Sequence, residues 1–159
     1  MLQLVRLILA VETIDGNGQS TLPPQAGGFA FPIPFDGVVF NLQVSCDAFA
    51  TTAASINTIG LKYVFTVFKE SSSNNSGIDQ PATGYITTAL SSTLTFGYPN
   101  TTVTATTYRT ATNLNSSTIL NVSAGDRIGI RIQTDATTDA SAAEVTSLSF
   151  SASLSYKPN

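Results

Sequence analysis

The chain of 159 residues contains no histidine, no tryptophan and a single cysteine, Cys46. Without histidine, the Ser-His-Asp and Cys-His catalytic arrangements are excluded, and the commonest protein metal ligand is missing. A single cysteine also excludes an intrachain disulfide. Cys46 follows Phe40, Leu42 and Val44 at alternate positions. We therefore expect its thiol to be a small buried hydrophobe rather than a nucleophile or a metal ligand.

Charge is scarce as well. Charged residues make up 11% of the chain, against roughly 25% in typical soluble domains. The net charge is −3 and the seven Lys and Arg residues form no cluster. Nucleic-acid binding needs several phosphate-neutralising cations, so this class of partner is excluded. Ser and Thr account for 41 of the 159 residues. Such a hydroxyl-rich surface fits an ordinary extracellular β-domain, and it also tolerates close lateral packing or glycosylation.

The few carboxylates do not form a recognisable catalytic or metal-binding motif. Asp135 and Asp139 flank a Thr-rich turn and could contribute to a calcium site. Calcium takes six to eight oxygen ligands, however, and two acidic residues in a turn are more typical of solvated turn formers. The Gly125-Asp126 pair lacks the glycine spacing and the following helix of a phosphate loop. We expect a protein that is not an enzyme and that needs no cofactor and no metal.

Alternating side chains predict strands throughout the chain. Ile128, Ile130 and Ile132 alternate with Arg127 and Arg131 directly after a turn at residues 124–126. Because successive strand residues point to opposite faces, the isoleucines can enter a core while the arginines stay in water. Residues 147–156 repeat this pattern, with serine at every odd position. We interpret the two stretches as neighbouring core strands of one β-sandwich.

Further strands are predicted between turn signals, and no segment after the N-terminus has helical periodicity. We expect these strands at residues 29–31, 38–46, 59–69, 85–90, 92–96, 101–110, 118–122 and 144–156. Many short strands without crossover helices indicate an all-β sandwich, barrel or jelly roll.

The first fourteen residues form a separate apolar segment. Residues 1–14 are too short to span a bilayer, and they lack the cleavage site of a signal peptide. An amphipathic helix fits them, and so does a strand. Residues 15–28 are rich in Gly and Pro and predict a flexible spacer before a domain at 29–159. Two arrangements stay open. The segment either forms the first strand of its own sandwich, or it leaves the subunit and completes a sheet in a neighbour.

For the second arrangement, docking is expected through apolar side chains of the N-terminal segment. These are Leu2, Leu4, Leu7, Leu9 and Val11. In the strand at 59–69, Tyr63, Phe65 and Val67 share one face while Val64 and Phe68 fall on the other. A strand with apolar residues on both faces is typical of one that is covered on both sides, as at an interface between subunits.

Two stretches carry a family resemblance. Residues 28–45, with their aromatic-Asp-Gly strand start, and residues 120–132, with their apolar-Ser-Ala-Gly-Asp turn, look like the C-terminal domains of exosporium glycoproteins. These are the BclA- and BclB-type collagen-like proteins of spore-forming bacilli. The resemblance spans about residues 28–156 and implies a TNF-like jelly roll that forms trimers. It also implies trimer contacts through outward apolar side chains, a role that Val64 and Phe68 could take by position.

The chain departs from this family because the apolar segment and spacer stand where a collagen stalk would be. It therefore looks more like a subunit of a spore-surface appendage, an endospore fibre. We expect a structural, self-assembling extracellular protein whose partners are itself and other spore-surface proteins. The alternative is a trimeric carbohydrate- or receptor-binding head of the adhesin or phage-fibre type, with Tyr98 and Tyr108 available for sugar stacking. A capsid-like shell would share the same fold.

Overall fold

A computed structural model describes residues 3–13, 31–50, 62–70, 85–96, 108–134 and 145–159. These residues form the strands β1 (Gln3–Thr13), β2 (Phe31–Pro32), β3 (Gly37–Ala50), β4 (Lys62–Glu70), β5 (Tyr85–Thr95), β6 (Tyr108–Asn115), β7 (Leu120–Val122), β8 (Arg127–Thr134) and β9 (Val145–Pro158). The predicted spacer at 15–28 lies outside them. Among the described residues, no helix has the length and apolar character needed to cross a membrane.

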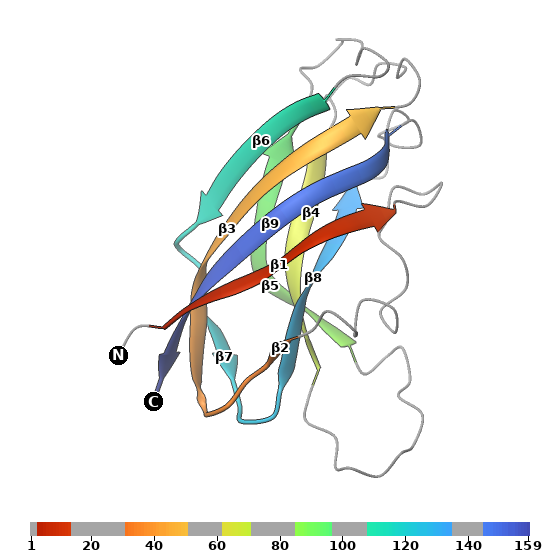
Figure 1. The fold of residues 1–159 in the computed structure, drawn as a ribbon. Coiled ribbons are helices and arrows are strands. Elements are labelled where there is room, and N and C mark those ends of the chain that lie inside the picture. Colours follow the sequence, from red (N-terminus) through yellow and green to blue (C-terminus); the bar gives the residue numbers. More distant parts are fainter. Residues whose placement is uncertain (1–2, 14–30, 51–61, 71–84, 97–107, 135–144) are drawn as a thin grey trace, which may run out of the picture.

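The strands form two antiparallel sheets that pack face to face (Figure 1). One sheet has the order β1-β9-β3-β6, with β7 also pairing with β3, and the other has the order β2-β8-β4-β5. The first and last long strands are neighbours, and the chain crosses repeatedly from one sheet to the other. This strand order is that of a jelly roll, in which two Greek keys close over one core. The predicted fold class, an all-β jelly-roll sandwich, is confirmed by this strand order.

The core lies between the two sheets and is built by alternate residues of each strand. Leu42, Val44 and Cys46 of β3 are buried, and so are Tyr63 and Phe65 of β4. The predicted inward faces of β8 and β9 are confirmed by the buried side chains Ile128, Ile132, Phe150, Ala152, Leu154 and Tyr156. The two sheets meet where the rings of Phe65 and Phe150 lie 5.5 Å apart between centroids. Period-2 patterning thus determines which face of each sheet turns inward.

Some predicted strand limits were wrong. Residues 85–95 form one strand, β5, where the sequence suggested a break before Ser92. Ser92 lies opposite Phe65 in the β4–β5 ladder and is 3% exposed, so this small polar residue continues the strand inside the sandwich. The strand expected at 101–110 is β6, which extends from Tyr108 to Asn115, and residues 101–107 lie outside the described part.

Candidate functional site

The N-terminal segment forms an edge strand. β1 pairs antiparallel with β9 over nine register positions, from Gln3 opposite Tyr156 to Thr13 opposite Ser147. The sheet order begins with β1, so β9 is its neighbour, and no other strand of the described residues pairs with the second edge of β1. Within the single chain, the segment therefore takes the first of the two arrangements that the sequence leaves open. Which copy supplies β1 in an assembly stays a prediction.

The predicted docking residues occupy different places along this ladder. Leu4 lies opposite Ser155, Leu7 opposite Ala152 and Val11 opposite Ser149. The register shifts between Leu7 and Ala10, so Leu9 falls in an irregularity, and Leu2 lies outside the described residues. A bulge of this kind inserts an unpaired residue and changes the phase of the alternation. A strand with uninterrupted alternation would place Leu7, Leu9 and Val11 on one face, and the register shift breaks this alternation.

The strand that receives β1 presents two chemically different faces. Ala152 and Leu154 of β9 are buried in the core, whereas Ser149 is exposed and Ser151 and Ser153 are partly buried on the outer face. On its other side β9 pairs with β3 over most of its length. Among the described strands, β3 therefore occupies one edge of β9, and a strand from another copy would pair with β9 at the edge that β1 occupies.

The second predicted interface pair lies on β4, in the opposite sheet. Val64 is partly buried, whereas Phe68 is 4% exposed in the isolated chain. Phe68 lies opposite Gly129 of β8, and a Cβ atom added to Gly129 would overlap the Phe68 ring. The missing side chain of Gly129 thus provides the space that the ring fills. Because Phe68 is already buried, a trimer contact through it would remove little further apolar surface from water. The trimer role of the pair stays a prediction.

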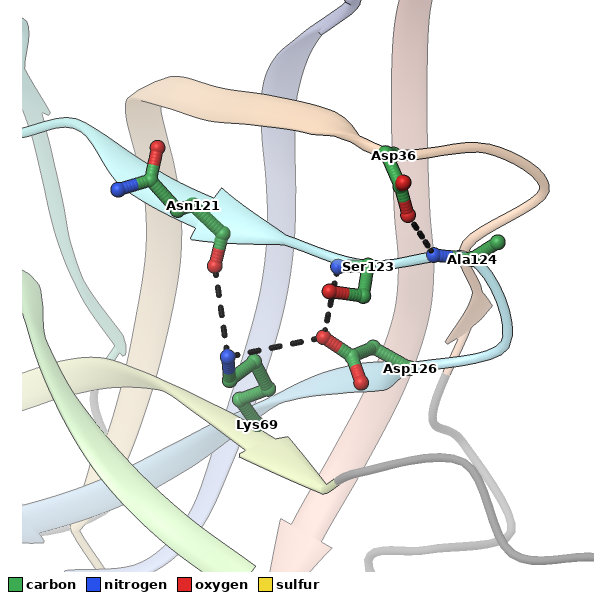
Figure 2. A network of polar contacts seen from close by, with 6 residues as sticks. All are labelled: Asp36, Lys69, Asn121, Ser123, Ala124 and Asp126. Carbon is green, nitrogen blue, oxygen red and sulfur yellow. Dashed lines mark hydrogen bonds and ion pairs between the residues drawn. The ribbon is translucent and has the colours of Figure 1, made fainter.

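The two motifs that carry the family resemblance meet at one end of the sandwich (Figure 2). The Asp36 carboxylate, at the strand start before β3, accepts a hydrogen bond of 2.8 Å from the Ala124 N–H in the turn between β7 and β8. In that turn Gly125 adopts a φ of 86°, a left-handed conformation that glycine adopts without strain. The Gly125 N–H donates to the Ile33 carbonyl at 2.7 Å, which ties the chain after β2 to the same turn.

A second acid completes this network. Asp126 is 4% exposed, and its carboxylate accepts a hydrogen bond of 2.8 Å from the Ser123 N–H. The ammonium of Lys69, at the end of β4, lies 3.6 Å from the same carboxylate and 3.5 Å from the carbonyl oxygen of Asn121, to which it donates (Figure 2). The network joins the end of β4 to the β7–β8 turn. Each of its two carboxylates accepts a hydrogen bond from a main-chain N–H, and we call this network the structural clamp.

A buried ion pair lies beside the clamp. Glu70 is fully buried at the end of β4, and its Oε2 accepts a hydrogen bond from the guanidinium of Arg127 at the start of β8. The other carboxylate oxygen, Oε1, has no hydrogen-bond partner among the residues that the structure describes. Glu70 and Arg127 lie opposite each other in the β4–β8 register. The alternation of residues in this strand predicts that Arg127 faces water, but it does not identify Glu70 as its partner.

The remaining candidates are a cysteine, two aspartates and two tyrosines. Cys46 is 1% exposed, and burial, with a smaller contribution from the Asp47 charge, raises the pKa of its thiol to about 12. Asp135, Asp139 and Tyr98 lie outside the described residues. Tyr108 begins β6. Within the described ranges, no three acidic, cysteine or histidine side chains gather in a way that would hold a metal ion.

Comparison with known proteins places the chain in no family. No family model matches it, and no curated protein matches it. Among solved structures, a crystal structure of murine APRIL at pH 5.0 aligns with 97% of this chain and 98% of that chain, with a TM-score of 0.39 and 13% sequence identity. A likeness this distant carries no functional argument, and the fold assignment rests on the strand order described above.

Proposed function

We propose that the chain is a structural, non-enzymatic subunit of an extracellular fibre on the spore surface, of the kind that the resemblance to BclA- and BclB-type domains suggests. The jelly rolls associate as trimers, and each subunit docks head to tail onto the next through its N-terminal segment. A head-to-tail contact uses two different surfaces and does not close on itself. It therefore propagates into a filament.

The observation that carries this proposal is the position of β1. It is an edge strand whose neighbour in the sheet is β9, and a Gly- and Pro-rich sequence at 15–28 separates it from the rest of the chain. A strand bound at an edge is held chiefly by main-chain hydrogen bonds, which any copy of the same strand can supply. An apolar edge strand beside a Gly- and Pro-rich sequence is thus suited to join one subunit to the next.

The surface chemistry supports close packing of subunits. The exposed positions described on β3, β6 and β9 are Gln43, Ser45, Asp47, Thr110, Thr112, Asn113, Leu114, Ser149 and Lys157. Only two of these side chains are charged, and Asp47 accepts a hydrogen bond of 2.5 Å from the Thr110 hydroxyl of its own sheet. Weak electrostatic repulsion between such faces favours lateral association, because little charge has to be desolvated on contact.

Negative-stain electron microscopy of the purified full-length chain tests the proposal. We expect filaments from the full chain, and dispersed trimers, by light scattering, when residues 1–14 are deleted. A second variant replaces Leu4, Leu7, Leu9 and Val11 by serine and keeps the chain length. It should also fail to form filaments if apolar docking is the cause.

Filaments from the truncated chain would overturn the connector role of residues 1–14. Discrete particles from the full chain, together with binding on a glycan array, would favour the carbohydrate-binding head, and closed shells would favour the capsid-like alternative.

A further inference from the structure

We infer that the acceptor of the docking segment is the edge of β9 in the neighbouring subunit, and that β1 enters it by strand exchange in the register it keeps within its own chain. This inference rests on the proposed function, since it requires subunits that meet head to tail. It assigns the partner surface, which the sequence pattern does not identify.

The exchanged and unexchanged arrangements contain the same ladder. β1 and β9 are antiparallel and paired over nine positions, and β9 has β3 on its other side. A β1 strand from another copy would form the same main-chain hydrogen bonds with β9. The two arrangements therefore differ only in the connection between β1 and the rest of its chain, and the local concentration of the neighbouring β9 decides between them.

The sequence between β1 and β2 sets how far β1 can reach. Residues 14–30 connect β1 to β2. A Gly-rich tether of that length has a root-mean-square span of roughly 20–25 Å if it is flexible, and at full extension it reaches roughly 55 Å. In an isolated chain the same tether favours the intramolecular pairing, which is the arrangement the single chain shows.

The β9 edge specifies one register. Val5, Leu7 and Ala10 of β1 lie opposite the buried residues Leu154, Ala152 and Phe150, with the register shift between Leu7 and Ala10. A slip by one residue would place these positions opposite the outward serines of β9, because strand residues alternate faces. The edge of β8 is a competing acceptor in the other sheet, since among the described residues β2 pairs with it at two positions.

Cysteine trapping distinguishes exchange from intramolecular pairing. Arg6 lies opposite Ser153, so the double variant R6C/S153C of the full chain places two thiols across the β1–β9 ladder. Opposed strand residues lie within disulfide distance. The native Cys46 does not interfere, because it is buried and its pKa is raised to about 12. The protein is allowed to assemble, is inspected by electron microscopy, and is then oxidised and run on a denaturing, non-reducing gel.

Two further variants control the register and the position. V11C/S149C provides a second in-register pair beyond the bulge, in case the first pair perturbs folding. R6C/S149C joins residues that are out of register and should not form the disulfide, because Ser149 lies opposite Val11 and is about 13 Å along β9 from Ser153.

Filaments whose oxidised chains run mostly as a ladder of covalent multimers support strand exchange. Filaments whose chains stay monomeric with an internal disulfide, or stay uncross-linked, overturn the β9 assignment but leave the fibre proposal standing. Equal cross-linking by the out-of-register pair overturns the assigned register. If the full chain forms no filaments, the proposed function itself fails, and strand exchange fails with it.

Discussion

Removing the guanidinium of Arg127 should destabilise the fold far more than removing the carboxylate that it binds. Glu70 is fully buried, whereas the side chain of Arg127 is 38% exposed. In the variant Arg127→Met, a charged carboxylate stays in the interior without its cation, and its Oε1 has no hydrogen-bond partner even in the native chain. Breaking a buried pair from one side in this way costs about 3–5 kcal/mol of folding free energy.

The lower end of that range, about 3 kcal/mol, is expected here because the open position of Arg127 lets water reach the carboxylate. Glu70→Gln keeps an oxygen acceptor for Arg127 and removes the buried charge, so we expect a change within about 1 kcal/mol. The double variant E70M/R127M replaces the pair by apolar side chains and should be close to neutral. The double substitution should therefore be milder than Arg127→Met alone.

Urea denaturation followed by circular dichroism measures these differences, with all variants at one protein concentration under conditions that keep the chain dispersed. Arg131→Met is the matched control, because it removes the same charge from the same face of β8. The reasoning fails if Arg127→Met costs less than about 1 kcal/mol, or if the double variant is as unstable as the single one.

Two further substitutions test separate parts of the sandwich. Gly37→Ala would push a Cβ atom into the Lys157 carbonyl oxygen and the Tyr156 ring. Overpacking of this kind costs about 1–3 kcal/mol, so the melting temperature should fall by several degrees. An unchanged melting temperature would contradict this close approach. The pKa of Cys46 is raised from 9.0 to about 12, so the folded state holds its thiol proton more tightly than the unfolded state. The resulting stabilisation is complete below pH 9 and is lost as the pH rises toward 12. Relative to its value well below pH 9, the free energy of unfolding of the native chain at pH 10 should therefore fall by roughly 1.4 kcal/mol more than that of Cys46→Ala. Chemical denaturation measures both values, and equal losses would refute the pKa shift.

The sequence predicted the parts of the fold that depend on local alternation. Ile128 and Ile132 of β8, and Phe150 and Leu154 of β9, are buried as their spacing indicated. This agreement has a simple cause. A sheet with one face in the core requires a period of two, and a slip by one residue would expose the whole apolar set.

Contacts between distant residues could not be predicted in this way. The Asp36 and Ala124 turns were each visible in the sequence, yet their hydrogen bond joins residues separated by 88 positions. Alternation also could not locate the register shift in β1 between Leu7 and Ala10, because a bulge depends on the partner strand as much as on its own residues. The register shift separates Leu7 from Val11 in the alternation, whereas the docking role of these residues stays a prediction.

The surroundings of Phe68 also depend on a residue of another strand, and its trimer role stays a prediction. An apolar residue on the outward face of β4 suggested a subunit interface, and nothing in its own strand argued otherwise. Its register partner is Gly129, whose missing side chain leaves space for the Phe68 ring within the same sheet. An aromatic ring that covers a cross-strand glycine satisfies its own burial. Outward apolar residues therefore indicate an interface only after the residues opposite them are known.

The distribution of charge connects the fold to the proposed assembly. In the described residues, Lys69, Asp126, Glu70 and Arg127 pair with one another around the ends of β4 and β8, and Asp36 is bound to the turn beside them. These five charged residues, in a chain with few charges, thus hold one end of the sandwich together. The faces of β3, β6 and β9 are left with mostly neutral hydroxyl and amide groups. Faces with so few charges repel one another weakly despite the net charge of −3, and in the proposed assembly the specificity of docking would come from strand register in the β1–β9 ladder.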